Sequence, residues 1–398
     1  MIEIKEKKDC CGCSACVQRC PKSCISLKED NEGFLYPIVD KDICIDCGLC
    51  EKVCPVLHQG KGRKPLKVYA AKNYDEEIRK QSSSGGIFTL LAEKVIQEGG
   101  VVFGARFDEN WEVKHDYTET MEGLTVFRGS KYVQSRVEDS YRKAERFLKQ
   151  GKKVLFSGTP CQIAGLKRFL HKEYENLLTV DFVCHGVPSP KVWKQYLKET
   201  IARMCDKNMV STDSIENFRV ESISFRDKSH GWKKYSFVLK LSVMSRSGVS
   251  NTVSLCEQFP QNTFMKGFLA DLYLRPSCYA CAAKCGKSGS DITIGDLWGA
   301  PSIIDTEDDD RGTSLILVNK NILLLGDNVL WVKQIKYQDA LDYNPSLELS
   351  VNIPRNRAFF YSALVKAKSL EYIINSITKK TFLSKILSFI KRLVGCFF

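Results

Sequence analysis

Two cysteine blocks close to the N-terminus place the strongest constraint on how this chain can fold. Ten of its 18 cysteines fall before residue 55, and eight of these ten form two blocks with the same C-x2-C-x2-C-x3-C spacing. The chain begins MIEIKEKKDCC, without an apolar signal core, so we expect it to stay in a reducing, cytoplasmic compartment. In that compartment, clustered cysteines indicate metal or redox chemistry rather than disulfide bonds. The first block holds Cys10, Cys13, Cys16 and Cys20, and the second holds Cys44, Cys47, Cys50 and Cys54.

A proline follows each block, at Pro21 and at Pro55, and completes the spacing found in bacterial-type ferredoxins. In that arrangement three thiolates of a block wrap one 4Fe–4S cluster, and the fourth ligates the cluster of the other block. The alternatives are a zinc site or a disulfide knot, but zinc is usually held by paired CxxC units. Residues 1–58 are therefore predicted to form a dicluster ferredoxin-type domain. One cluster is assigned to Cys10, Cys13, Cys16 and Cys54, and the other to Cys44, Cys47, Cys50 and Cys20.

Four other residues of this segment also enter the prediction. Gly12 and Gly48 are expected to let the backbone crowd the cluster sulfurs, because glycine has no Cβ. Cys11 and Cys24 lie off the repeated spacing, and we interpret both as small buried thiols without a metal role.

Composition and charge narrow the function classes. A chain of 398 residues is long enough for two or three domains with their own cores. The net charge of +12 is spread along the chain with no basic tract or nucleic-acid-binding motif, so no nucleic-acid partner is predicted. A solvated basic surface, or attraction to acidic partners, is expected instead. No apolar run reaches the roughly 18 residues that a transmembrane helix needs, so no membrane span is predicted.

After the cysteine-rich segment the sequence changes character. Residues 59–66 carry QGKGRKP, a polar stretch with glycine and proline that indicates a linker. Over 67–345, strand-like segments such as VVFGARF alternate with helix-like segments such as IFTLLAEKVIQ. This alternation predicts a mixed α/β domain with an at least partly parallel sheet. A β-meander is expected over 215–256 as an inserted or appended unit, and short strands are expected over 291–345, with an acidic loop at 305–312.

A serine- and glycine-rich loop, QSSSGGIF, precedes one of the apolar helices. Backbone amides at a helix N-terminus, with hydroxyls beside them, form a cradle for an anion. The alternative is a serine helix cap with a flexible turn, and both interpretations remain open at this stage. The residues of the loop are Ser82, Ser83, Ser84, Gly85 and Gly86.

Two further cysteines follow predicted strands. Cys161 in LFSGTPCQIAG and Cys184 in DFVCHGVPSP both stand where a strand ends. Ligands of open parallel sheets gather beyond the carboxyl ends of the strands, so both thiols are expected to face one crevice. Cys161 could be a nucleophile, a metal ligand or a core residue, but two thiols in one crevice favour a shared metal. His185 is interpreted as a turn residue or as a hydrogen-bond partner of a cofactor.

The stretch RPSCYACAAKC adds Cys278, Cys281 and Cys285, whereas a 4Fe–4S cluster takes four thiolates. Either this stretch borrows ligands from elsewhere or it is not a metal site. The stretch SDITIGDLWGAP follows closely, at 290–301, with Asp296 and Trp298 at a Gly-rich bend. Such a bend can line a cofactor pocket, and the alternative is a plain turn with a core tryptophan.

Several of these motifs together resemble the coenzyme F-420 hydrogenase/dehydrogenase beta-subunit family. The residues that carry the resemblance are SSSGGIFTLLAEKVI, GTPCQIAGLKRFL, DFVCHGVPSPKVW, CYAC and SDITIGDLWG, in this order, behind the ferredoxin-like head. The family implies a flavoprotein whose core domain binds FAD and a 4Fe–4S cluster. Its pattern places the flavin loop at residues 82–86 and leaves Cys285 as a spare. The family's recurring core cysteines match Cys161, Cys184, Cys278 and Cys281, which we predict as ligands of a third cluster.

The resemblance implies an iron–sulfur flavoprotein oxidoreductase that passes electrons between clusters, FAD and a two-electron carrier or small-molecule substrate. A redox partner protein or a small electron carrier is the expected partner. Some relatives with a fused ferredoxin head are associated with surface-polysaccharide biosynthesis, so the family name does not fix the substrate. The alternative is an electron-transfer subunit that serves a partner enzyme and has no substrate pocket. A non-redox protein with structural zinc is the third possibility, and the double spacing disfavours it.

The C-terminal region, 346–398, is predicted to be helical. Its last segment, 381–398, has apolar residues at helical spacing with lysine and arginine off that stripe. A basic amphipathic helix of this kind can lie on the inner face of an anionic membrane. The alternative is a helix that packs on this protein's own core or on a partner.

Overall fold

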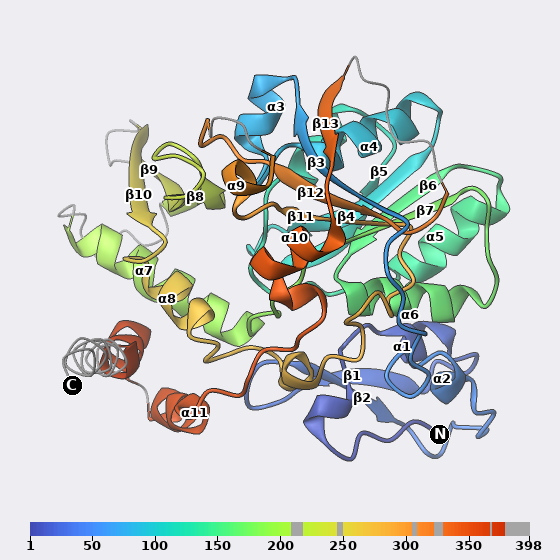
Figure 1. Cartoon of the computed structure of the whole chain (residues 1–398). Coiled ribbons are helices and arrows are strands. Elements are labelled where there is room, and N and C mark those ends of the chain that lie inside the picture. Colours follow the sequence, from blue (N-terminus) through green and yellow to red (C-terminus); the bar gives the residue numbers. More distant parts are fainter. Residues whose placement is uncertain (208–217, 245–249, 305–308, 322–328, 367, 379–398) are drawn as a thin grey trace, which may run out of the picture.

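An eight-stranded mixed sheet organises most of the chain (Figure 1). The computed structural model describes all residues except 208–217, 245–249, 305–308, 322–328, 367 and 379–398. From one edge of the sheet to the other, its strands are β13 (Leu330–Gln334), β3 (Lys67–Asn73), β12 (Ser314–Val318), β11 (Ile292–Asp296), β7 (Leu177–Phe182), β6 (Val154–Gly158), β4 (Val101–Phe107) and β5 (Val113–Thr118). The central strands β11, β7, β6 and β4 run parallel to one another, and all other pairs are antiparallel.

The parallel strands are covered on both faces. Phe103 and Phe156 point into a core shared with α5 (Ser140–Lys149) and α6 (Pro160–Leu170). Their neighbours Val102 and Leu155 point into the opposite core, against α4 (Ile87–Gln97). Strands buried on both faces are apolar throughout rather than alternating, which explains the short hydrophobic runs VVF and VLF.

The ferredoxin-like domain lies against the α6 side of the sheet, at the bottom of Figure 1. It contains a hairpin of β1 (Ile25–Glu29) and β2 (Leu35–Val39) with the short helices α1 (Ala15–Arg19) and α2 (Leu49–Lys52). Hydrogen bonds connect the ferredoxin-like domain to the rest of the chain. Arg357 donates to both carboxylate oxygens of Glu32 at 2.8 and 2.6 Å, and the amide of Tyr141 donates to Gln18 at 3.0 Å.

A smaller lobe stands beside the main sheet, on the left of Figure 1. It consists of an antiparallel sheet and helices that share one aromatic core around Trp193, which is 1% exposed. The Trp193 ring lies 5.0 to 6.2 Å from the rings of Phe225, Phe237 and Phe264. The elements are β8 (Phe218–Asp227), β9 (Ser236–Met244), β10 (Ser250–Gln258), α7 (Pro190–Lys207), α8 (Thr263–Leu269), α11 (Arg357–Val365) and the helical residues 370–378.

The predicted fold class is confirmed: a ferredoxin-like head precedes a larger mixed α/β domain. The meander expected over 215–256 is present as β8, β9 and β10, although 215–217 and 245–249 lie outside the described residues. The prediction of short strands over 291–345 is wrong in part. Alongside β11, β12 and β13, that section forms the helices α9 (Ala300–Ile304) and α10 (Tyr337–Tyr343). Helix α3 (Glu76–Gln81) and strand β5 were not foreseen, because their polar residues give no clear periodicity.

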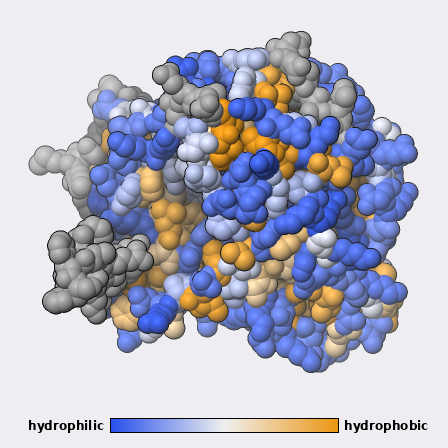
Figure 2. All heavy atoms as spheres, viewed as in Figure 1, coloured by the Kyte–Doolittle hydropathy of each residue, from blue (hydrophilic) through white to orange (hydrophobic). Residues whose placement is uncertain are grey.

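The face seen in Figure 2 is mostly hydrophilic, with hydrophobic residues gathered in separate patches. Within the described part of the chain, no helix combines the length and the apolar character that crossing a bilayer requires. The segment 381–398, for which membrane contact was predicted, lies outside the described residues, as does part of the acidic loop, 305–308.

Candidate functional site

The first predicted ligand set lies where the ferredoxin-like domain meets α6. Burial, together with negative charge on Cys10 and Cys54, raises the pKa of the Cys16 thiol to about 12. Burial also raises the pKa of Cys54, with a contribution from Cys10. Cys13 is buried against α6, where an added Cβ on Gly165 would lie 2.9 Å from its sulfur. Neighbouring thiols raise one another's pKa, so they ionise together only beside a positive partner such as iron. A group of such thiols is the kind of donor set that binds an iron–sulfur cluster.

The second predicted set lines one small cavity of the same domain. Cys20 enters it after α1, and Cys44, Cys47 and Cys50 enter it around α2. The off-pattern residue Cys24 lines this cavity as well, with its sulfur 3.3 Å from that of Cys20. The crossed assignment, in which each block lends its last cysteine to the other, is consistent with this placement.

The two block glycines share a positive φ but differ in the protein atoms around them. Gly12 has a positive φ of 72°, and a Cβ there would lie 2.7 Å from a guanidinium nitrogen of Arg275. Gly48 has a φ of 71°, but nothing lies within 4 Å of its Cβ position. The left-handed backbone by itself favours glycine at position 48, and the expected close approach to a cluster stays a prediction.

The third predicted set also comes together, although its members are distant in sequence. Cys161 stands at the start of α6, where Pro160 and a capping box of Thr159 and Gln162 open the helix. Cys184 follows β7, and Cys278 and Cys281 lie at the short helix η4 (Pro276–Ala280). One cavity is lined by all four of these cysteines, Cys161, Cys184, Cys278 and Cys281.

The thiols of this cavity influence one another. Burial raises the pKa of Cys278 to about 12, with further contributions from Cys161 and Cys281. Burial likewise raises the pKa of Cys184, with a contribution from Cys278. No three His, Cys, Asp or Glu side chains among the described residues converge closely enough to hold a single metal ion. A 4Fe–4S cluster instead needs four thiolates arranged around a shared space, because each thiolate binds a different iron.

Two cysteines outside the predicted set occupy contrasting positions. Cys285 does not line the cavity, and its sulfur lies 3.5 Å from the carbonyl oxygen of Glu348. Cys11 does line it, is 7% exposed, and hydrogen-bonds to both Cys13 and Cys161. The hydrogen bond that Cys161 donates to Cys11, followed by burial, raises the pKa of Cys161 well above its usual value, which does not favour an activated nucleophile. Cys11 thus links the first and third cysteine sets, a position that its irregular spacing did not reveal.

A much larger cavity of about 580 Å³ lies beyond the carboxyl ends of β6, β7 and β11. Its volume is in the range of ligand pockets, roughly 300–1,000 Å³. The predicted loop residues Ser82, Ser83, Ser84 and Gly86 line it, and so do His185 and Asp296. Gly85 does not line it, because its backbone packs against β3 and β12, where a Cβ would lie 2.6 Å from the carbonyl oxygen of Ala71.

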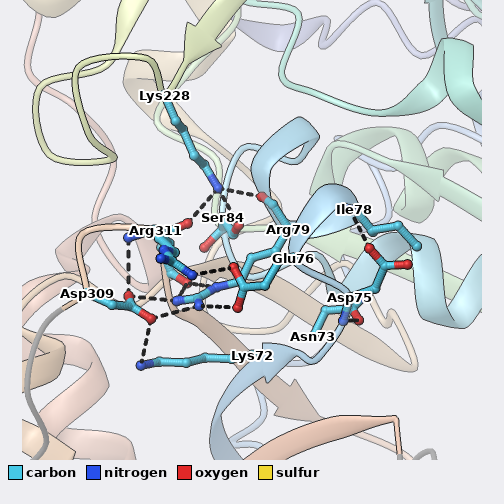
Figure 3. A network of polar contacts seen from close by, with 11 residues as sticks. Lys72, Asn73, Asp75, Glu76, Ile78, Arg79, Ser84, Lys228, Asp309 and Arg311 are labelled. Carbon is cyan, nitrogen blue, oxygen red and sulfur yellow. Dashed lines mark hydrogen bonds and ion pairs between the residues drawn. The ribbon is translucent and has the colours of Figure 1, made fainter.

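The serine loop is held in place by its own side chains and by a basic network (Figure 3). Ser84 donates to the carbonyl of Thr313 at 3.0 Å, and Ser83 accepts from the amide and hydroxyl of Ser130 at 2.7 and 2.8 Å. Lys228, from the turn after β8, donates to the carbonyls of Arg79, Ser84 and Arg311 at 2.7 to 2.8 Å. Lys228, which follows β8 of the smaller lobe, therefore holds the serine loop of the main domain in place. The hydroxyl groups of Ser83 and Ser84 are themselves engaged in hydrogen bonds within the protein.

Residues 184–187 line both the four-cysteine cavity and the large cavity. This shared wall is the turn after β7, and it includes Cys184 and His185. His185 Nε2 lies 2.6 Å from a carboxylate oxygen of Asp271. Asp271 follows helix α8 of the smaller lobe, so a residue that is not part of the main sheet orients the imidazole ring. A group bound in the large cavity would therefore lie beside the third cysteine set.

Arg275 is a residue that sequence reasoning missed, although it begins the stretch RPSCYACAAKC. It is 1% exposed, and its side chain donates to the carbonyls of Cys10 and Leu35 at 2.7 and 2.9 Å. A guanidinium nitrogen also lies 3.5 Å from the Cys10 sulfur. Its backbone carbonyl accepts from Cys278, so Arg275 connects the first cysteine set to the third. A buried arginine gives no periodic signal, which is why the motif alone did not identify it.

His115 on β5 lines the large cavity and yields a pH prediction. Burial lowers its pKa to about 4, against a small opposing effect of the Ser157 carbonyl. The unfolded chain takes up this proton near pH 6.5 and the folded chain does not, so stability is lost as pH falls from about 6.5 to about 4. Between pH 7 and pH 5 this residue is expected to account for about 2 kcal/mol.

The thermal unfolding midpoint, measured at both pH values, should therefore fall further for the wild type than for His115→Gln. Glutamine keeps a polar group near Ser157 and Ser135 but does not titrate. Equal falls in the two proteins would contradict the prediction.

Comparison with known families agrees with this architecture. A ferredoxin-like head with two four-cysteine sets, followed by a mixed α/β domain, defines an iron–sulfur protein, and residues 9–57 match the 4Fe-4S dicluster domain. Residues 68–140 and 151–325 match the N-terminal and C-terminal parts of the coenzyme F420 hydrogenase/dehydrogenase beta subunit. Together these two matches cover more than half of the chain. The chain belongs to the coenzyme F420 hydrogenase/dehydrogenase beta-subunit family.

Individual relatives are distant. The coenzyme F420-dependent sulfite reductase of Methanocaldococcus jannaschii is 23% identical over 247 residues, which are 58% of this chain and 38% of that protein. One subunit of the F(420)H(2) dehydrogenase of Methanosarcina mazei is 23% identical over 219 residues, 50% of this chain and 62% of that protein. The chain thus spans less than two thirds of either relative. A 7Fe ferredoxin of Hydrogenibacillus schlegelii is 42% identical over 65 residues, 16% of this chain and 77% of the ferredoxin.

Among solved structures, a chain of the F420-reducing [NiFe] hydrogenase complex from Methanosarcina barkeri is similar with a TM-score of 0.41 and 19% identity. The similarity covers 71% of this chain and 90% of that chain.

Proposed function

We propose that this chain is an iron–sulfur flavoprotein oxidoreductase that passes electrons between three 4Fe–4S clusters, FAD and a two-electron carrier or small-molecule substrate. Domain 1–58 would hold two clusters, and the domain 67–345, joined to it by 59–66, would hold the third cluster and the flavin. The observation that carries the proposal is the wall 184–187, which is common to the four-cysteine cavity and the 580 Å³ cavity. The ligands of the third cluster would be Cys161, Cys184, Cys278 and Cys281.

A flavin supplies exchange between one-electron and two-electron transfer, which clusters alone do not provide. The residues that would hold it are Ser82, Ser83, Ser84 and Gly86 of the serine loop, with His185 and Asp296 on the cavity wall. Apolar side chains such as Phe182 and Phe268 line the same cavity and would limit its water content. The protein's own contribution would be orientation, burial and hydrogen bonding.

An electron-transfer subunit serving a partner enzyme is the second candidate. One relative, from Methanosarcina mazei, is named as a subunit of a dehydrogenase, and this name favours the second candidate. In that case the chain would carry clusters without a flavin or a substrate of its own. A link to surface-polysaccharide biosynthesis stays a prediction from the resemblance.

A census of iron, sulfide and flavin in anaerobically purified protein separates the two candidates. The flavoprotein proposal predicts about twelve irons, twelve sulfides and one flavin per chain. The substitution Gly86→Val should lower the flavin content and leave the iron unchanged. Gly86 has a φ of 85°, and its Cβ position lies 3.1 Å from the side chain of Asn73. A full iron content with no flavin, even after incubation with FAD, would favour the electron-transfer subunit.

A further inference from the structure

Arg226 presents an unused hydrogen-bonding edge to the large cavity. It belongs to β8 of the small lobe, lines the cavity and is only 7% exposed. Its Nε and Nη2 atoms are buried and have no hydrogen-bond partner. A buried donor without a partner is destabilising because it has lost its hydrogen bonds to water, so an acceptor is expected to bind there.

The remainder of the side chain is firmly held. Nη1 donates to Asp296 at 2.7 Å and to the hydroxyl of Tyr132 at 3.4 Å. The guanidinium carbon lies 4.3 Å from the ring centre of Tyr235 and 5.6 Å from that of Trp298. Nε and Nη2 lie on one side of the planar guanidinium, where two parallel N–H bonds match a carboxylate or a phosphate. The unused edge is therefore already oriented for bidentate recognition.

The charges around the cavity agree with an anionic ligand. Asp296 is the only carboxylate among the described residues that line it, and it is already paired with Arg226. Arg128 and Lys131 also line the cavity. The ammonium of Lys131 is occupied by three backbone carbonyls, including that of Arg128 at 2.8 Å, so it does not compete for the ligand. Arg128 also has a buried Nε without a partner, but its Nη1 donates to Gln81 and its Nη2 pairs with Glu93. Arg226 offers two adjacent donors and is thus the group best placed to meet an anion.

We propose that the Nε–Nη2 edge of Arg226 binds an anionic oxygen group, a carboxylate or a phosphate, of the small molecule that exchanges electrons in this cavity. This inference rests on the proposed function and names the chemical class of its substrate. A phosphate could also come from the diphosphate of FAD, so the test has to separate the two sources.

The test uses the full chain under anaerobic conditions and inorganic phosphate as the ligand. Calorimetric titrations are carried out on flavin-free protein and on protein saturated with FAD. We expect wild-type protein to bind phosphate in both states, and Arg226→Gln to weaken that binding by about 10- to 100-fold. Arg219→Gln is the matched control, because Arg219 lies on the same strand with a side chain that is 84% exposed, and it should bind like wild type.

Arg226→Lys keeps the positive charge but loses the two parallel N–H groups of the guanidinium. This variant should bind phosphate about tenfold more weakly than wild type. This variant keeps the test valid if Arg226→Gln does not fold, as judged by its iron content and thermal midpoint. Absence of phosphate binding to wild type in both states would overturn the inference.

Binding that disappears once FAD is present would overturn it too, because the diphosphate of FAD would then occupy the edge. Arg226-dependent phosphate binding by a protein that takes up no FAD supports the anion site and refutes the flavoprotein proposal instead. The two failures are therefore distinguishable.

Discussion

Replacing Cys281 with alanine should lower the iron content of anaerobically purified protein from about twelve to about eight atoms per chain. Cys281 lines the cavity of the third set, where burial and the neighbouring Cys161 raise the pKa of its thiol. A cluster that loses one of four thiolates is not retained as a 4Fe–4S cubane, whereas the two N-terminal sets contain no residue from this region. Sulfide should fall by the same proportion, and the remaining clusters should keep their spectra.

Cys285→Ala is the matched control, four residues further along. Cys285 is also partly buried, but it points toward the Glu348 carbonyl rather than into the cavity. Its φ of 58° is unaffected by the exchange, since alanine and cysteine both carry a Cβ. The control should keep all the iron. If Cys281→Ala kept the full count, or if Cys285→Ala lost four irons, the assignment of the third site would be wrong.

Replacing Arg275 with glutamine should loosen the attachment of the ferredoxin-like domain. The change leaves the carbonyls of Cys10 and Leu35 and the amide oxygen of Gln134 without their buried donor. The expected loss of stability is about 3 kcal/mol or more, since each unsatisfied buried group costs about 1–3 kcal/mol. A lower thermal midpoint and faster proteolytic release of 1–58 would report it. Arg219→Gln, an exposed arginine, should change neither.

The same substitution should lower the reduction potential of the cluster that we predict at Cys10, Cys13, Cys16 and Cys54. A positive charge and an N–H group near a cluster sulfur favour the reduced, more negative state. Removal of both is expected to shift the potential down by about 60 mV, a tenfold change for one electron. An EPR-monitored redox titration measures this shift. The second cluster, predicted at Cys44, Cys47, Cys50 and Cys20, serves as an internal reference. An unchanged potential in a correctly folded variant would limit Arg275 to a structural role.

Much of the fold followed from local patterns. The apolar runs of β4 and β6 and the periodicity of α4 and α6 were sufficient to predict a mixed α/β domain. Helix α10 escaped prediction because its burial depends on neighbours far away in sequence. In α10, Ala340 alone is fully buried, so the helix has almost no apolar stripe of its own.

The sequence alone predicted the N-terminal cysteine sets, because the cysteines of each block lie three or four residues apart and the repeated spacing itself assigns each of them to a cluster. It also pointed to the serine loop and to the strand ends after β6 and β7. Only the tertiary structure decided that Cys161, Cys184, Cys278 and Cys281 share one cavity and that 184–187 separate it from a larger one. Only the tertiary structure, too, showed Arg275 beside Cys10 and the unpaired edge of Arg226. The physical reason is that the contacts of a buried charged side chain come from segments far away in the sequence. The spacing of residues within one motif contains no information about those contacts.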